Sequence, residues 1–312
     1  MNQSIDRREF VKRCVVAGAG IIMGPTASKA FMRSGSPAPY ELSAVAGDRY
    51  FDNVMKAVDA LGGMRRFVQP GNSVGILVNS PLGGRAAFTH PDVSLAVVKM
   101  CLEAGAKQIY ALNDISQKYW RRSGLYQSMK PEIDRIRYSD EKTEVSIDKG
   151  KVLKKADIST LLLSCDVYIN IPIIKDHEGT KFTCNLKNMM GACSGSTCRR
   201  FHFGESSGLL GLFKGYYSNV EILAQSIADV NLVRQPNLCV VDATEILATN
   251  GPSGPGEVRT PKEVIASTNC VAADMYATRH LGLNWEELLV VKYAQLHGYG
   301  PKTLKEISTK IL

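Results

Sequence analysis

The sequence lacks several features that would place it at once in a common class of protein. Its 312 residues hold no uninterrupted apolar run of the roughly 20 residues that a membrane-spanning helix needs. No run of lysines and arginines is interleaved with aromatic residues, which disfavours nucleic-acid binding. No G-x-G-x-x-G joins an apolar run to a helical pattern, and no internal repeat is found. The usual dinucleotide fingerprint and a repeat array are therefore both excluded.

The first thirty residues have the order of an export signal. A basic start that ends at Arg13 is followed by a short apolar stretch at 15–23 and by small residues up to Ala30. The run Asp6-Arg-Arg-Glu-Phe-Val-Lys12 resembles the twin-arginine signal. We therefore expect a signal peptide over residues 1–30 and export of the folded chain by the twin-arginine translocase. The expected location is periplasmic or extracytoplasmic, with no stable membrane-spanning segment after cleavage.

Charge and composition set limits on the rest of the chain. The whole sequence carries +8, but five basic and two acidic residues among the first thirty contribute +3, which leaves about +5 for the mature protein. A modest positive charge suits a small anionic ligand. Residues 31–47 are rich in Ser, Pro, Ala and Gly and are predicted to form a flexible linker. A single domain is then expected over residues 48–312.

Beyond the linker, β-like and helix-like patterns alternate. Short apolar runs predict strands at 73–79, 108–113, 166–172, 237–242 and 263–267. Amphipathic stretches predict helices at 50–61, 91–104, 158–164, 219–233, 271–281, 285–297 and 301–310. The charged segment 118–155 is less regular and is expected to hold one helix and one hairpin or edge strand. This order predicts an α/β fold, with a mostly parallel open sheet flanked by helices in three layers.

The segment that follows the strand at 166–172 is the richest in polar groups. It runs from Asn170 to Gly191 and is expected to form a strand, a polar loop and a helix that begins between Thr180 and Thr183. The free N–H groups in the first turn of such a helix would favour an anion. Five side chains are therefore predicted to converge on a carboxylate or phosphate: Lys175, His177, Thr183, Lys187 and Asn188. The alternative is a solvated loop with ordinary helix-capping threonines.

The same segment resembles the signature of the DUF362 family, a set of bacterial and archaeal proteins of largely unknown function. The similarity covers roughly Ser73 to the C-terminus and is most specific from Lys175 to Gly191. Further matching positions are Arg200–His202, Ile227–Asp229, Val240–Asp242, Asn250–Pro252, Ala272–Asp274 and Gly282. The resemblance implies no established activity. Some members carry a ferredoxin-like cluster, but this sequence has no C-x-x-C-x-x-C-x-x-x-C run, so an iron–sulfur cluster is disfavoured.

Seven cysteines follow the predicted signal, and an odd number cannot all be paired within one chain. Cys193 and Cys198, together with His202 and with Cys184 or His177, offer thiolates and an imidazole that could hold zinc or iron. Two alternatives stay open for the Cys193 and Cys198 pair. The two residues could form a disulfide after export, or they could be free thiols in a loop rich in Gly and Ser.

These residues together predict a site at the carboxyl ends of the strands. Proton transfer is assigned to Lys175, His177, His202 and Asp242. Ligand binding is assigned to Thr183, Lys187, Asn188, Arg200 and Asn250. The predicted function is an enzyme that acts on a small carboxylate or phosphate by acid/base chemistry. Two other functions remain open: a metal-binding or iron–sulfur redox accessory protein, and a periplasmic ligand-binding protein without catalysis.

Overall fold

The computed structural model describes residues 40–81, 83–203 and 219–312. The predicted twin-arginine signal at 1–30 and the first part of the predicted linker lie outside these residues. Within the described ranges, no helix is long and apolar enough to cross a membrane. The segment Pro39–Leu312 forms a single compact unit by its internal contacts.

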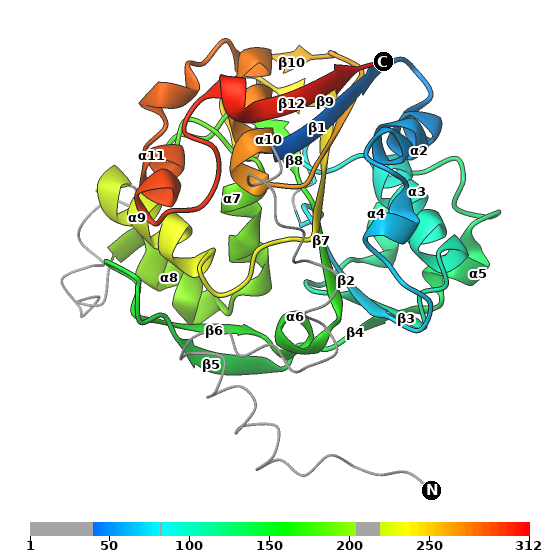
Figure 1. Ribbon diagram of the computed structural model, residues 1–312, viewed down its shortest axis with the longest axis horizontal. Helices are drawn as coiled ribbons and strands as arrows, with labels where there is room; N and C mark the ends of the chain where they lie inside the picture. Colours follow the sequence, from blue (N-terminus) through cyan, green and yellow to red (C-terminus); the bar gives the residue numbers. More distant parts are fainter. Residues whose placement is uncertain (1–39, 82, 204–218) are drawn as a thin grey trace, which may run out of the picture. The chain divides into compact units, whose positions relative to one another are not determined.

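A ten-stranded sheet lies at the centre of this unit (Figure 1). Eight strands follow the order β12-β1-β11-β9-β7-β2-β3-β4, and β8 and β10 both pair with β9. Most neighbours are parallel, whereas β11 is antiparallel to β1 and β9, and β10 is antiparallel to β9. The strands of this sheet are β1 (Tyr40–Ala46), β2 (Ser73–Val78), β3 (Gln108–Ala111), β4 (Ile136–Tyr138), β7 (Val167–Ile171), β8 (Ile173–Lys175), β9 (Leu238–Leu247), β10 (Val258–Arg259), β11 (Glu263–Ser267) and β12 (Ile307–Ile311). A separate hairpin pairs β5 (Lys142–Ser146) with β6 (Lys155–Ser159).

Helices lie on both sides of this sheet (Figure 1). On one side are α2 (Tyr50–Ala60), α3 (Pro91–Glu103), α4 (Gln117–Trp120) and α5 (Lys130–Ile133). On the other are α7 (Asn185–Asn188), α8 (Gly195–Phe203), α9 (Val220–Val230), α10 (Cys270–Ala277) and α11 (Leu289–Leu296). The short α6 (Thr160–Ser164) precedes β7. The predicted α/β class with a mostly parallel sheet is thus confirmed.

The sheet separates two hydrophobic cores. Along β7, Val167, Ile169 and Ile171 belong to the core beneath α2 and α3, while Tyr168 belongs to the core beneath α9 and α11. Successive strand residues point to opposite faces, so a strand that is buried on both faces is apolar throughout. Asn170 is the exception in β7, and it lies on the same face as Tyr168.

The two ends of the described chain differ from the sequence-based prediction. Residues 40–46, expected in the linker, form β1 between β11 and β12. Leu42 and Ala44 face one core and Val45 faces the other, so the strand is held by burial despite its small and polar residues. Residues 301–310, expected to be helical, contain a 3₁₀ turn and most of β12. Pairing with β1 supplies backbone hydrogen bonds that override the helical pattern there.

Three loops gather where β2, β8 and β9 end. A Cβ on Gly251 would lie 1.7 Å from the carbonyl oxygen of Asp176, and one on Gly84 would lie 2.4 Å from that of Ser253. The loop after β9 therefore packs backbone against backbone on the loops that follow β8 and β2. This close packing fixes the backbone immediately after Lys175, at the edge where the sequence predicts the site.

Candidate functional site

Lys175 is the last residue of β8 and is almost fully buried, with 2% of its surface exposed. Its Nζ donates hydrogen bonds to Asn79 Oδ1 at 3.1 Å and to the carbonyl oxygen of Ala87 at 2.6 Å. Burial and, to a smaller extent, the nearby charge of Lys187 together lower the pKa of the Lys175 ammonium to about 7. Both the charged and the neutral form of this amine are therefore populated near neutral pH.

His177 lies two residues further on and is also buried. Its Nδ1 accepts the backbone N–H groups of Gly179 at 3.0 Å and Thr180 at 3.2 Å, which places the ring proton on Nε2. Burial, together with the charges of Lys187, Lys175 and His202, lowers the pKa of this imidazole to about 3. His177 is thus a neutral hydrogen-bond donor at physiological pH and a poor base.

Lys187 and His202 complete a group of four basic side chains, which we call the basic group. Lys187 is half-buried on α7, and burial lowers the pKa of its ammonium to about 8. No hydrogen bond or ion pair joins this ammonium to another residue in the described ranges. His202 is buried near the end of α8, close enough for its charge to act on His177. The structure therefore groups Lys175, His177, Lys187 and His202.

Thr183 faces the same way as Lys175. The two residues exchange backbone hydrogen bonds of 3.2 and 2.8 Å as an antiparallel pair. Directly opposed residues in such a pair project their side chains to the same face. The Thr183 hydroxyl is buried and has no hydrogen-bond partner among the residues that the structure describes. An unsatisfied buried hydroxyl costs about 1–3 kcal/mol, so a ligand atom that bonds to it would recover this energy.

The prediction of an anion site at a helix N-terminus is wrong. Helix α7 spans only four residues, and Thr183 lies before it in the pair with Lys175, so Thr183 and Lys187 do not share a helical face. The backbone N–H groups of Asn185 and Leu186 are taken by the Asp274 carboxylate at 2.8 and 3.0 Å. Burial raises the pKa of Asp274 to about 6. The Asp274 carboxylate on α10 therefore occupies the position at the start of α7 that a bound anion would take.

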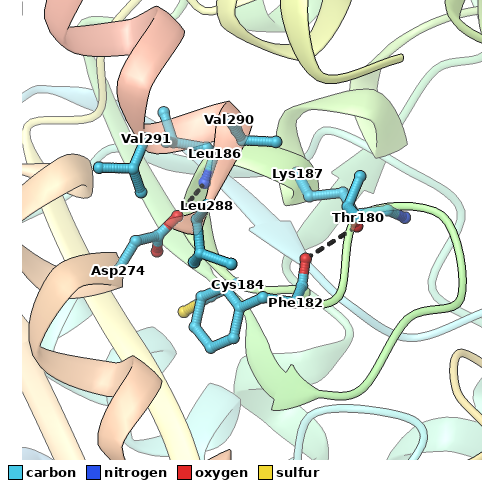
Figure 2. A pocket seen from close by; sticks show the side chains of 9 residues that line it. All are labelled: Thr180, Phe182, Cys184, Leu186, Lys187, Asp274, Leu288, Val290 and Val291. Atoms are coloured by element: carbon cyan, nitrogen blue, oxygen red, sulfur yellow. Dashed lines mark hydrogen bonds between the residues drawn. The ribbon is translucent and has the colours of Figure 1, made fainter. Parts of the chain in front are cut away.

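A small hollow lies beside this capping carboxylate (Figure 2). Its cavity volume is only about 10 Å³, and its lining is mostly apolar: Thr180, Phe182, Cys184, Leu186, Lys187, Asp274, Leu288, Val290 and Val291. Asp274 lies on one side of the hollow, and Thr180 and Lys187 lie on the other (Figure 2). Lys187 therefore borders both the hollow and the basic group.

Four asparagine side chains connect Lys175 with Asp274, and we call them the amide chain. In spatial order they are Asn79, Asn188, Asn170 and Asn185, with Lys175 bonded to the first and Asp274 to the last. Of these four, only Asn188 was predicted as a site residue, and its side-chain amide is hydrogen-bonded to Asn79 and Asn170. Asn79, Asn170 and Asn185 were missed, although an amide inside the apolar strand β7 was a signal that could have been used.

The Asp242 carboxylate accepts hydrogen bonds from residues outside the basic group. It accepts the backbone N–H of His90, at the start of α3, and that of Thr244 at 2.8 Å. Burial raises its pKa, and these two hydrogen bonds oppose that shift. The geometry therefore makes Asp242 an internal anchor for α3 rather than a partner of the basic residues.

The side chains of Arg200 and Asn250 form hydrogen bonds with nearby residues that are not part of the predicted site. Arg200 Nη2 bonds to Asp157 Oδ2 at 3.2 Å and to Thr197 Oγ1 at 2.9 Å, which ties α8 to β6. Asn250 is exposed, has a positive φ of 56°, and donates to the carbonyl oxygen of Pro255 at 3.1 Å. Its left-handed backbone and this bond are typical of a turn residue. None of these hydrogen bonds involves a member of the basic group.

The cysteines do not form one ligand set. All seven described cysteines are free thiols. Cys193 and Cys198 donate to the carbonyl oxygens of Met189 and Met190, whereas Cys184 contacts the Asn185 amide beside Asp274. Across residues 40–81, 83–203 and 219–312, no group of three or more His, Cys, Asp or Glu side chains could hold a metal ion. The predicted grouping of Cys184, Cys193 and Cys198 around zinc or iron is therefore not found.

Comparison with known proteins adds the following relatives. A thylakoid-associated protein of Synechocystis sp. is 26% identical over 239 residues, which are 73% of this chain and 68% of that protein. The lactate racemase apoprotein from Thermoanaerobacterium thermosaccharolyticum is 15% identical with a TM-score of 0.38, over 64% of this chain and 49% of the racemase. A protein from Thermotoga maritima is 14% identical with a TM-score of 0.43, over 80% of this chain and 60% of that chain. This chain thus spans only about half of the racemase.

The match to a family is more extensive. Residues 75–279 match the family described as "Domain of unknown function (DUF362)". This range contains every residue of the basic group and the whole amide chain, and it covers well over half of the sequence. The chain belongs to the DUF362 family.

Proposed function

We propose that this protein is an enzyme that binds a small carboxylate or phosphate at the basic group and transfers a proton through Lys175. The observation that carries the proposal is the charge environment of that group. Among the described residues, the charged side chain with a direct electrostatic effect on Lys175 is another base, Lys187. Buried cations are costly without a counter-ion, and a bound anion would supply one.

Each member of the site has a separate task in this proposal. The ammonium of Lys187, which has no partner among the described residues, is the main electrostatic contact for the anion, because its pKa of about 8 keeps it mostly charged at neutral pH. Thr183 donates its buried hydroxyl, which has no hydrogen-bond partner in the part of the chain that the structure describes. These donors hold the ligand in one orientation and stabilise negative charge that develops on it.

Lys175 is suited to move the proton. A general acid or base works best when its pKa is close to the working pH, and burial brings this amine to about 7. In its neutral form it takes a proton from carbon next to the bound carboxylate, and in its charged form it returns one. Isomerisation, racemisation and elimination next to an acidic carbon are the reactions that such a pair of steps serves.

Calorimetric titration of the full chain with inorganic phosphate and with succinate tests the binding step. Both lysines lose protons between pH 7 and pH 9, so we expect binding at pH 6.5 that weakens at least about tenfold at pH 9. Lys187→Met should abolish binding at pH 6.5, whereas Lys107→Met, at an exposed lysine, should not change it. Absence of binding by both anions at pH 6.5, or equal binding by Lys187→Met and the parent chain, would overturn the proposal.

We also propose that the folded chain is exported by the twin-arginine pathway and works outside the cytoplasm. The support is the run Asp6-Arg-Arg-Glu-Phe-Val-Lys12, with the apolar stretch and small residues that follow it.

A further inference from the structure

The hydrogen bonds of the amide chain all run in one direction. Beginning at the Lys175 ammonium, each group donates to the next: Lys175 Nζ to Asn79 Oδ1 (3.1 Å), Asn79 Nδ2 to Asn188 Oδ1 (3.0 Å), Asn188 Nδ2 to Asn170 Oδ1 (2.7 Å), Asn170 Nδ2 to Asn185 Oδ1 (3.3 Å), and Asn185 Nδ2 to Asp274 Oδ1 (3.0 Å). Every amide therefore turns its oxygen toward the cation and its N–H group toward the carboxylate.

Hydrogen bonds to backbone carbonyl groups, which are not part of the amide chain, fix this direction. The Nδ2 of Asn188 also donates to the carbonyl oxygen of Leu77 at 3.1 Å, and that of Asn170 also donates to the carbonyl oxygen of Asn185 at 3.0 Å. A carbonyl oxygen only accepts, so either amide turned over would place two oxygens in contact. At one end the ammonium only donates, and at the other an ionised carboxylate only accepts. The orientation is therefore set at both ends and in the middle.

Burial makes this alignment effective. Asn170, Asn185 and Asn188 are at most 5% exposed, and so are Lys175 and Asp274. In such surroundings, hydrogen bonds are electrostatically stronger than in water, and neighbouring ones polarise each other. Aligned amide dipoles favour a positive charge at one end and a negative charge at the other. A change of charge at Asp274 is thus transmitted to Lys175 through the amide chain.

We propose that Asp274 is a positioning residue for Lys175: acting through the amide chain, it holds the lysine in place and favours its ammonium form. The relevance of this coupling to catalysis rests on the proposed function, but the coupling itself does not. Sequence alone placed Asp274 on a helix with no defined partner. In the structure it both caps α7 and terminates the amide chain.

NMR titration of lysine side chains in the ligand-free full chain tests the coupling directly. The ¹³Cε signal of Lys175 is assigned by its loss in Lys175→Arg. Asp274→Asn keeps an oxygen for capping α7 but removes the charge, and we expect it to lower the pKa of Lys175 by at least about half a unit, or about threefold in its proton affinity. Asn170→Leu breaks the middle of the chain and leaves both charges in place, so a shift in the same direction is expected.

Asp229→Asn is the matched control. Asp229 is an equally buried carboxylate that accepts backbone N–H groups, those of residues 151–153, but it is not part of the amide chain. A Lys175 titration that is unchanged in Asp274→Asn would make Asp274 a helix cap alone and overturn the inference. An equal shift in Asp229→Asn would do the same, because it would reflect general loosening of the core. No ligand is added in this experiment, so its result is independent of whether phosphate or succinate binds.

Discussion

Lys175 should make the stability of the protein depend on pH. Its pKa falls from 10.5 to about 7 on folding, a shift that corresponds to about 5 kcal/mol at about 1.4 kcal/mol per pKa unit. Between pH 7 and pH 10.5 the unfolded chain binds a proton at this lysine and the folded chain does not. The contribution of Lys175 to the free energy of unfolding therefore rises with pH across this window, and the full penalty is present below pH 7.

Lys175→Met should reveal this penalty. The substitution keeps an unbranched chain, removes the charge, and leaves Asn79 Oδ1 and the carbonyl oxygen of Ala87 without their donor, at a total cost of about 3 kcal/mol. At pH 6 the variant gains about 5 kcal/mol of stability from removal of the buried charge and loses about 3 kcal/mol from the two missing hydrogen bonds. It should therefore be about 2 kcal/mol more stable than the parent chain. At pH 9 the penalty that remains in the parent chain is about 2 kcal/mol, so the variant should be about 1 kcal/mol less stable.

Urea denaturation at pH 6, 7, 8 and 9 measures both quantities. The free-energy difference between Lys175→Met and the parent chain should change by about 3 kcal/mol over this range and should reverse its sign. Lys107→Met, at an exposed lysine, supplies the control, and its free energy of unfolding should change with pH as that of the parent chain does. If the free energy of unfolding of Lys175→Met also follows the parent chain at every pH, Lys175 titrates like an ordinary lysine. The reasoning about its role in proton transfer would then be refuted.

Three further outcomes are expected. A Cβ at Gly251 would overlap the carbonyl oxygen of Asp176, so Gly251→Ala should lower the free energy of unfolding by more than about 2 kcal/mol and weaken phosphate binding. Gly124→Ala should do neither, because Gly124 has open space around it. Calorimetry measures both effects. Asp229→Ala should cost about 3 kcal/mol in urea denaturation, because three backbone N–H groups lose their acceptor, but phosphate affinity should persist. Replacing both Arg7 and Arg8 by lysine should leave the protein in the cytoplasmic fraction, and unchanged export would contradict the twin-arginine proposal.

The sheet was largely predictable because its strands are buried on both faces. Continuous apolar runs gave β7 and β9, and β11 was predicted with its observed bounds of Glu263–Ser267. Local pattern failed where pairing decides the structure. In β1, four consecutive residues are buried, but serine and alanine among them interrupt the apolar run. β12 is a strand because β1 lies next to it. Such pairings join residues more than 200 positions apart and leave no local signal.

Part of the site was predictable because its residues are close together in the sequence. Lys175, His177, Thr183 and Lys187 lie within thirteen residues of one another, so one strand and one loop bring them together. The amide chain could not be predicted, because Asn79 meets Asn188 across 109 positions and Asn185 meets Asp274 across 89. The role of Asp274 as a cap also follows only from the packing of α10 on α7. A carboxylate in a helical pattern gave no indication of the partner it would meet.

The position of β1 between β11 and β12 determines when this sheet can be completed during synthesis. Both neighbours of the first strand come from residues 263–311, so β1 has no partner until most of the chain has left the ribosome. A chain that stalls before residue 263 carries β1 with two bare backbone edges, and one that stalls before residue 307 carries it with one. Exposed edges of this kind pair readily with other chains. Truncated products of this protein should therefore aggregate and be degraded instead of persisting as partly folded molecules.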